Sequence, residues 1–266
     1  RAGTALMEIV SHPCMHSAED ALAYMTSIKQ IMQYGGISSC DQEKGQMRSD
    51  VNISVRPIGQ KELGSKVEIK NMNSFAFIQE AIEYEIDRQI AVLESGGSVE
   101  QETRGYDSDR GETFVQRSKE DAHDYRYFPE PDLLPLQLSE DEIAAWRMEL
   151  PELPEQRKMR YIELLGLPEY DASVLTSDKA ISDWFEEVLI HTSQAKAVSN
   201  FIMGEMMRLL AEKNSEIGVC QITPIALAQV VDFIQAGTIS RGAGKQIVEI
   251  LFNEGGDPQR IIESKG

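Results

Sequence analysis

A strict alternation of polar and apolar residues from position 47 to position 57 constrains this chain more than any other feature. In the stretch MRSDVNISVRP the side chains of Val51, Ile53 and Val55 fall on one face of a strand, because successive side chains point to opposite sides. The opposite face, called the polar face below, carries Arg48, Asp50, Asn52, Ser54 and Arg56. A cation, a carboxylate, an amide and a hydroxyl on one surface predict a site for a charged ligand. A solvated face with cross-strand ion pairs is the alternative.

A second strand is predicted at KVEIKN, residues 66–71, after a hairpin connection at residues 56–66. Its apolar residues, Val67 and Ile69, are expected to face inward, and Glu68 and Lys70 outward. Pairing of the two strands would place Glu68 and Lys70 on the same surface as the polar face.

Other elements of the first part follow from periodicity and capping residues. TALMEIV, residues 4–10, predicts a short apolar strand interrupted by Glu8. A helix is predicted from Ser17 to the glycines at 35 and 36, with Asp20 closing a capping box. Its expected buried stripe consists of Leu22, Met25, Ile28 and Met32.

A further helix is predicted within residues 71–97, with Asn73 or Ser74 as its cap. Its apolar residues at helical spacing are Ile78, Ile82, Ile86, Ile90 and Leu93. The free N–H groups at the start of this helix would open just beyond a polar strand, which predicts an anion pocket. Residues 102–120 predict another hairpin, with DSDRG at its turn.

From Ser139 onward the apolar periodicity is helical throughout. Helix caps are predicted at Ser139, Thr176 or Ser177, Thr223 before Pro224, Ser240, and Asp257 before Pro258. Buried positions are expected at Trp184, Phe185, Val188, Leu189, Ile225, Leu227, Val230, Val231 and Ile234. The predicted fold class is α+β: a largely antiparallel sheet with flanking helices in residues 1–138, followed by an all-α helical domain in residues 139–266. PELPEQRK, residues 151–158, is the expected junction.

The composition excludes several classes of protein. A formal net charge of −18, with acidic residues in excess in both halves, argues against a chain that coats nucleic acid nonspecifically. No apolar run is long enough for a membrane helix, and the segment RAGTALMEIV, which lacks a basic start and a long apolar middle, is not expected to be a signal peptide. Three widely spaced cysteines favour a reducing, cytoplasmic setting over a disulfide framework. Because no initiator Met is present, the chain is expected to be the interior of a longer one.

The residues of the two predicted strands suggest a chemistry for the polar face. Mg²⁺ prefers hard oxygen ligands such as carboxylates and keeps open coordination positions for substrate phosphates. Carboxylates from separate strands could hold it here, namely Asp50, Glu68 and in addition Glu8. Cationic side chains would then neutralise a phosphate or carboxylate, and amides and a hydroxyl would orient it. The cations are Arg48, Lys70 and Arg56, and the orienting groups are Asn52, Asn71, Asn73 and Ser74.

Three other motifs invite functional interpretations that the sequence does not favour. HPCMH offers His12, Cys14 and His16 as zinc ligands, but it has no second half, so a loop before a helix is preferred. SRGAGK, residues 240–245, lacks the spacing of a phosphate-binding loop and predicts a helix start. DYRYFPEPDL, residues 124–133, is best interpreted as a rigid crossover, although Arg126 and Glu130 could line a pocket. No covalent nucleophile is indicated.

Several segments, taken together and in order, are similar to the B subunit of the aspartyl/glutamyl-tRNA amidotransferase over nearly the whole chain. The most specific of them are RSDVNISVRP, VEIKNMNS and DYRYFPEPDL. The others are RAGTALMEIVS, QETR, PELP, YDASVLTSDKA and the closing GDPQRIIESKG.

The resemblance implies one subunit of a heterotrimeric ligase. A glutaminase A subunit would supply ammonia and a small C subunit would brace the pair. With ATP and Mg²⁺, the B subunit would phosphorylate the side-chain carboxylate of misacylated Glu-tRNA(Gln) or Asp-tRNA(Asn), which ammonia then converts to the amide. The resemblance places Glu8, Asp50 and Glu68 at acidic active-site positions, with Glu8 as the best match for a metal ligand. Arg48, Asn52, Lys70, Asn71 and Asn73 fall within its matching motifs.

The resemblance also implies a fragment and shows departures. Residues 1–138 would form the later part of a cradle-like catalytic domain, and the remainder a helical domain that docks tRNA. An N-terminal part with further ATP and metal contacts and a C-terminal tail domain would be missing, so the fragment alone is expected to be inactive. The chain has HPCM where the family shows EPDM, and EKGQMR in place of EEGSLR, which puts Lys44 near the site. These departures keep open a non-catalytic adaptor that binds tRNA or partner subunits.

Overall fold

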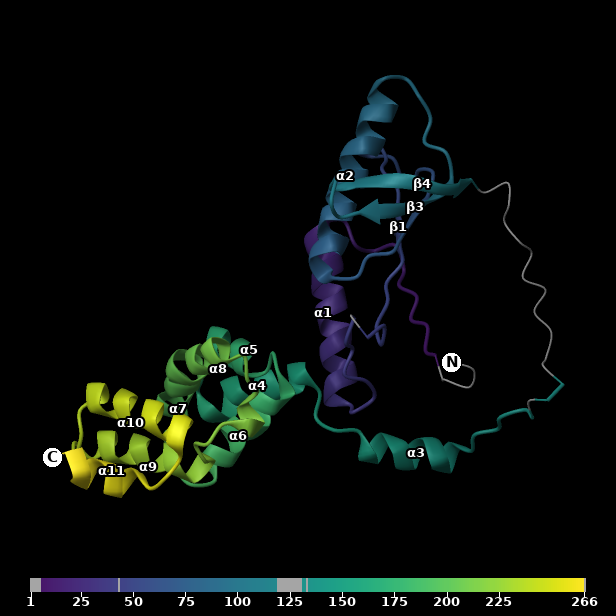
Figure 1. The fold of residues 1–266 in the computed structure, drawn as a ribbon. Coiled ribbons are helices and arrows are strands. Elements are labelled where there is room, and N and C mark those ends of the chain that lie inside the picture. The colour runs from purple at the N-terminus through teal and green to yellow at the C-terminus, as the bar shows by residue number, and fades with distance from the viewer. Residues whose placement is uncertain (1–5, 43, 119–130, 133, 266) are drawn as a thin grey trace. The chain divides into compact units, whose positions relative to one another are not determined.

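The computed structural model describes residues 6–42, 44–118, 131–132 and 134–265, which form two compact units (Figure 1). The first unit contains residues 1–32 and 38–145, and the second contains residues 33–37 and 146–266. Mixed strands and helices in the first unit and helices alone in the second confirm the predicted α+β class. No helix in the described ranges is long and apolar enough to cross a lipid bilayer.

The first unit is built on a four-stranded sheet in the order β1-β2-β3-β4. Its elements are α1 (Ala18–Tyr34), β1 (Val51–Ile53), β2 (Val67–Lys70), α2 (Phe75–Glu94), β3 (Glu102–Asp107) and β4 (Glu112–Ser118). The pairs β1/β2 and β3/β4 are antiparallel, as predicted, and β2/β3 is parallel. The parallel pair arises because α2 carries the chain back over the sheet between these two strands.

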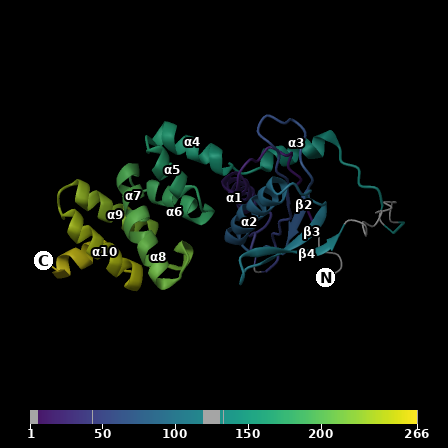
Figure 2. The same cartoon turned by 90° about the horizontal axis from the view of Figure 1, so that it is seen from above.

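The core of this unit lies between the sheet and its helices. Figure 2 shows α2 beside the sheet, with α1 next to α2. Val67 and Ile69 are fully buried and face this core, as predicted. They pack with residues of both helices and of β3, namely Ala18, Met25, Ile78, Ala81, Ile82 and Tyr106. The polar residues of β1 and β2, Asn52, Glu68 and Lys70, therefore lie on the opposite face of the sheet.

Three expectations for this unit are wrong. Residues 6–10 are exposed and lie outside any strand, so the apolar strand around Glu8 does not form there. Only Val51–Ile53 of the alternating stretch is strand. In α2, Ile90 and Leu93 are exposed, and Glu85 and Gln89 are buried in their place. These polar groups are tolerated inside because each is hydrogen-bonded.

The helix starts of the first unit follow local chemistry. The Ser17 hydroxyl accepts a hydrogen bond from the Asp20 N–H at 3.1 Å, and the Asp20 carboxylate accepts one from the His16 N–H. The Ser74 hydroxyl accepts from the Phe77 N–H at 3.1 Å, which settles the cap of α2. Of the stripe predicted for α1, Met25 is buried, and Leu22, Ile28 and Met32 are half-buried.

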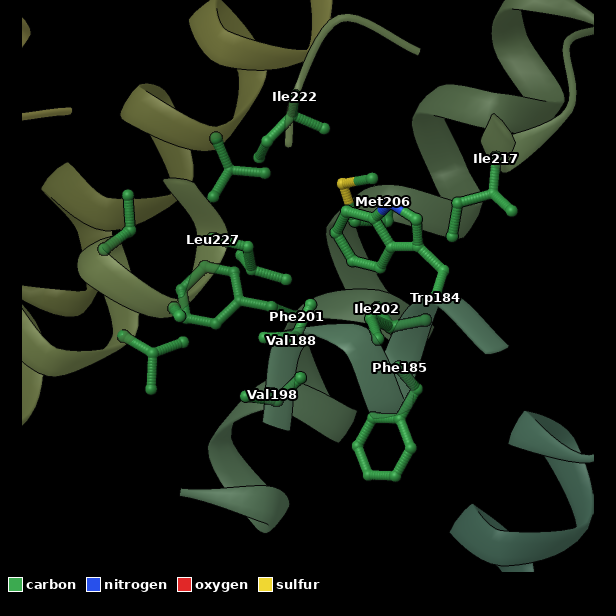
Figure 3. Packing of buried hydrophobic residues seen from close by; sticks show 14 of the residues in the cluster. Trp184, Phe185, Val188, Val198, Phe201, Ile202, Met206, Ile217, Ile222 and Leu227 are labelled. Atoms are coloured by element: carbon green, nitrogen blue, oxygen red, sulfur yellow. The ribbon is translucent and has the colours of Figure 1, made fainter. Parts of the chain in front are cut away.

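The second unit is a helical assembly around one apolar core (Figure 3). Trp184, Phe185 and Val188 of α6 meet Phe201, Ile202 and Met206 in that core. The helix α3 (Glu140–Glu149) is divided between the two units after Ala145. The further elements of the second unit are α4 (Pro154–Leu165), α5 (Glu169–Leu175), α6 (Lys179–Leu189), α7 (Ala195–Phe201), the π-helix η2 (Ile202–Met206), α8 (Met207–Lys213), the 3-10 helix η3 (Ile217–Val219), α9 (Pro224–Gln235), α10 (Arg241–Glu254) and α11 (Pro258–Lys265).

Most predicted caps of these helices are confirmed. The side chains at Ser139, Thr223, Ser240 and Asp257 each accept a backbone N–H at a helix start. The cap of α6 is Asp178, because its carboxylate accepts from two N–H groups, whereas Thr176 ends α5. Of the predicted core residues, Ile225 is 48% exposed. It occupies the first turn of α9, beyond the reach of the packed interior.

A cluster of charged residues joins α4 to α6 in the second unit. Glu186 accepts hydrogen bonds from Arg157 Nε at 2.7 Å, Arg160 Nη2 at 2.5 Å and the Tyr161 hydroxyl at 2.9 Å. Arg157 also donates to Asp183, and Arg160 to Glu152. Burial disfavours the charged form of Glu186, but the donors outweigh this and lower its pKa to about 2.

Candidate functional site

The polar face predicted for residues 47–57 is assembled on strands β1 and β2. Asn52 is directly opposite Glu68 in the antiparallel register, so both side chains point away from the buried Val67 and Ile69. Asp50 immediately precedes β1 and Lys70 ends β2. The structure thus brings Asp50, Asn52, Glu68 and Lys70 together on one surface, as the alternation implied.

Lys70 is the electrostatic centre of this surface. Its ammonium donates a hydrogen bond to Asp50 Oδ2 at 2.8 Å and lies 3.4 Å from Glu68 Oε1. The other oxygen of Glu68 accepts a hydrogen bond from the Thr103 hydroxyl on β3 at 3.0 Å. The hydrogen bond to Asp50 and the two neighbouring carboxylates raise the pKa of Lys70, so the amine is charged at neutral pH.

Three residues, Asp50, Glu68 and Lys70, therefore form one partly exposed cluster, called the Lys70 cluster below. Two carboxylates against one ammonium leave it with a formal charge of −1. About half of the Asp50 side chain and a third of the Lys70 side chain are exposed. An exposed cluster can exchange its internal ion pairs for contacts with a ligand at small cost, because surface ion pairs are worth about 1 kcal/mol or less.

Two side chains of the Lys70 cluster, Asp50 and Glu68, are candidate ligands for a divalent cation. Asp50 and Glu68 supply hard carboxylate oxygens from adjacent strands, and Mg²⁺ is commonly held by one or two carboxylates together with substrate phosphates. Glu8 does not join them: it is exposed in a segment without regular structure. Among the described residues, no group of three or more His, Cys, Asp and Glu side chains is placed to hold a metal. The two strand carboxylates thus fit the ion in kind, with Lys70 between them.

Of the three residues predicted to bind a cofactor, two have clear structural roles. Asn71 has a backbone φ of +67°, a left-handed conformation that Asn tolerates better than most residues. Asn73 is exposed in the turn before α2. The Ser74 hydroxyl caps α2, so one of its acceptor positions is already occupied. All three border the Lys70 cluster in sequence at the point where β2 leads into α2.

Two predicted cations belong to the flanking loops. Arg48 is exposed two residues before Asp50, and its guanidinium lies near Gly45. Arg56 donates to the carbonyl of Lys61 inside the connection between β1 and β2. Arg56 therefore stabilises that connection.

The remaining motifs do not add to the site. His12 and Cys14 are joined by a backbone hydrogen bond in an irregular segment before α1, as preferred from the sequence. SRGAGK forms the first turn of α10, capped by Ser240. The motif DYRYFPEPDL, with Arg126 and Glu130, lies almost entirely outside the described residues.

A buried polar network beneath the sheet was not anticipated. Glu85 and Gln89 of α2, both fully buried, connect to Arg104 on β3 and Thr113 on β4. The helical pattern Ile78, Ile82, Glu85, Gln89 contains a signal for it, because these positions share one face at spacings of three and four residues. The apolar pattern alone does not predict the network, because Glu85 and Gln89 are polar residues on the buried face of α2.

Comparisons with known proteins show which family the sequence resembles. The model of the GatB/GatE catalytic domain matches residues 1–144, and the model of the GatB domain matches residues 183–266. A protein of Thermodesulfovibrio yellowstonii is 46% identical over 266 residues, which is 100% of this chain and 56% of that protein. It is named as the B subunit of an aspartyl/glutamyl-tRNA(Asn/Gln) amidotransferase.

Other relatives carry the same name. One from Persephonella marina is 48% identical over 267 residues, and one from Oceanobacillus iheyensis is 49% identical over 266 residues. Each alignment covers 100% of this chain and 56% of the relative. The chain thus spans about half the length of the curated relatives that it matches. With a family model over more than half of its residues, the chain belongs to the GatB family.

Proposed function

We propose that this chain contributes the surface on which a tRNA-dependent amidotransferase activates a carboxylate with ATP. The substrate would be the side chain of Glu-tRNA(Gln) or Asp-tRNA(Asn). The observation that carries the proposal is the Lys70 cluster, where an ammonium lies between two carboxylates on an exposed strand surface. The names of the relatives, which are subunits of such an amidotransferase, supply the reaction class.

The chemistry requires two steps because a carboxylate is a poor electrophile at neutral pH. In the first, a carboxylate oxygen of the aminoacyl side chain attacks the γ-phosphorus of ATP, the bond to the β,γ-bridging oxygen breaks, and ADP leaves. In the second, ammonia attacks the carbonyl carbon of the acyl phosphate. Inorganic phosphate departs with the electron pair of the C–O bond, and the nitrogen loses a proton. In the first step two anions, the substrate carboxylate and the γ-phosphate of ATP, must approach each other.

Lys70 is suited to reduce this repulsion. Its raised pKa keeps the ammonium charged, and its partial exposure lets it turn from Asp50 toward a phosphate or carboxylate oxygen. Asn52, opposite Glu68 and exposed, is placed to orient the same group through its amide. Asp50 and Glu68 would hold Mg²⁺, and that ion would supply charge neutralisation for the phosphates. Arg48 would meet the outer phosphates.

Ammonia would come from another subunit, and the tRNA would bind a part of this chain outside the Lys70 cluster. A glutaminase A subunit is proposed as the source of ammonia, and a small C subunit as the third member. The helical second unit is proposed to help dock the misacylated tRNA. Because the chain spans 56% of its relatives, these partners belong to the proposal for the whole protein.

A substitution in the assembled full-length enzyme tests the proposal. Asp50→Ala should abolish formation of ADP that depends on misacylated tRNA, because it removes one carboxylate of the Lys70 cluster. Glu62→Gln is the matched control, since Glu62 is an exposed acid in the neighbouring loop. Recovery of the intact assembly by gel filtration would exclude misfolding. Undiminished amide formation by the Asp50→Ala enzyme would refute the catalytic role.

One observation favours a second candidate function. No group of three potential metal ligands exists within the described ranges, and Lys70 already neutralises part of the acidic pair. An adaptor that binds tRNA or partner subunits without catalysis would also satisfy these facts. In that case the Asp50→Ala enzyme would keep its amide-forming rate, whereas the catalytic proposal requires its loss.

A further inference from the structure

Gln89 of α2 makes an unusual set of contacts with the strand that carries part of the site. Its side chain is fully buried. The carboxamide oxygen accepts a hydrogen bond from the Val55 N–H at 3.1 Å, and the carboxamide nitrogen donates to the Ile53 carbonyl at 3.4 Å. One amide thus holds two backbone groups of the segment that continues β1.

The geometry matches that of a missing neighbouring strand. In an extended chain the carbonyl of one residue and the N–H of the residue two positions later point to the same side. Strand β1 lies at the edge of the sheet and has only three residues, paired to β2 on one side. The Gln89 amide offers an acceptor to Val55 and a donor to Ile53, as the C=O and N–H of one residue in an adjacent parallel strand would. It therefore restrains an otherwise open edge.

Gln89 is itself fixed by charged neighbours. Its nitrogen also donates to Glu85 Oε1 at 2.9 Å. Glu85 accepts from Arg88 at 2.6 Å and 3.0 Å and from the Thr113 hydroxyl at 2.9 Å. Burial opposes ionisation of Glu85, but these donors outweigh it and hold its pKa below the usual range. The anion that orients the Gln89 amide is thus present at neutral pH.

The network extends across the sheet to the edge strand opposite β1, which is β4. Arg104 of β3 donates to both the hydroxyl and the carbonyl of Thr113 on β4, each at 2.8 Å. Arg104 also pairs with Glu102 at 2.6 Å. A continuous chain of hydrogen bonds therefore runs from β4 through Glu85 and Gln89 to the end of β1. Glu85, Gln89, Arg104 and Thr113 are all buried, so a lost hydrogen bond in this chain would leave a polar group without a partner away from water.

We propose that Gln89 is a positioning residue, which fixes β1 so that Asp50 and Asn52 are held against Lys70 on β2. Asp50 and Asn52 precede the two anchored groups by only a few residues on a short edge strand, so a shift of β1 would separate Asp50 from Lys70. The effect on catalysis rests on the proposed function. The effect on strand position does not, and it can be measured without activity.

Hydrogen exchange on the 266-residue chain tests the positioning. In Gln89→Leu, amide exchange of residues 51–55 should rise by about tenfold, the scale of one or two lost hydrogen bonds, while residues 102–107 are unchanged. Gln79→Leu is the matched control: it makes the same chemical change on α2, where the Gln79 amide donates to Glu83 of the same helix. Equal exchange in wild type and Gln89→Leu would overturn the proposal.

A second measurement covers the case in which Gln89→Leu does not fold. In the wild-type chain the Val55 amide lies outside β1, yet it should exchange as slowly as the amides of β1. Exchange of Val55 at the rate of the loop at residues 57–63 would overturn the proposal, whatever the variant does.

A kinetic readout separates positioning from general stability. In the assembled full-length enzyme, Gln89→Leu should lower kcat while KM for ATP changes by less than about twofold. If Asp50→Ala leaves activity intact but the exchange results hold, the proposed function fails and the positioning stands.

Discussion

Glu186 should make the second unit lose stability in acid, and the structure gives the size of the effect. Its pKa is about 2, against 4.5 for a free glutamate. Because the folded pKa is depressed, the stabilisation is complete above the unfolded value and is lost as pH falls from about 5 toward 2. The full shift would correspond to about 3 kcal/mol, at about 1.36 kcal/mol for each pH unit.

Solvent reduces this figure. The Glu186 side chain is 34% exposed, and a partly exposed ion pair is screened by water. We therefore expect about 1–2 kcal/mol from Glu186 at neutral pH. The substitution Glu186→Gln should remove it, since an amide keeps the shape but carries no charge for the two arginines.

Urea unfolding followed by tryptophan fluorescence measures this free energy. Both tryptophans of the chain, Trp146 and Trp184, belong to the second unit, so the signal reports on that unit. The difference between wild type and Glu186→Gln should be largest near pH 7 and should shrink steadily toward pH 2. Glu187→Gln is the matched control, because Glu187 is exposed on the same helix.

Two results would refute this reasoning. One is a constant difference between wild type and Glu186→Gln from pH 7 to pH 3, which would mean that charge is not the cause. The other is an equal loss in Glu187→Gln, which would assign the effect to the net charge of the helix.

Three further substitutions test local features by the free energy of unfolding. Gly64→Ala should cost about 1–3 kcal/mol, because the added Cβ would lie 2.2 Å from the backbone carbonyl oxygen of Val55. Gly204→Ala is the control and should be neutral or stabilising, because a Cβ there would meet nothing within 4 Å. Equal effects of the two substitutions would contradict the close approach at Gly64. Ser74→Ala should cost about 0.5–2 kcal/mol through loss of the α2 cap, and no loss would argue against that cap. Asn71→Ala should cost about 1 kcal/mol more than Asn71→Gly, since φ is +67°, and a reversed order would deny that the backbone conformation selects Asn.

Local patterns predicted the centre of the site well. Alternation in residues 47–57 and in KVEIKN placed Asp50, Glu68 and Lys70 on one surface, and the structure confirms this with contacts of 2.8 Å and 3.4 Å. The reason is that a slip by one residue would turn Val67 and Ile69 out of the core, so burial of the apolar face selects one register. Asn71, Asn73 and Ser74 were found next to the cluster in the chain, and their binding roles remain predictions.

Long-range placement could not be predicted in the same way. Glu8 was assigned to a strand because its neighbours are apolar, yet Leu6, Met7 and Val10 are exposed. Apolar composition alone does not say which surface will cover a segment. Likewise Ile90 and Leu93 fit the helical period of α2, but the face of the helix that is buried contains Gln89 instead.

The sequence by itself determined the local elements of this protein: the helix caps, the hairpin of β3 and β4, and the division of each strand into an apolar and a polar face. These follow from interactions within a few residues, where spacing fixes geometry. Only the tertiary structure decided that β2 and β3 run parallel, that Glu85 and Gln89 are buried, and that an amide from α2 holds the edge of β1. A buried polar group is stable only when distant residues supply its partners, and here they come from three different strands.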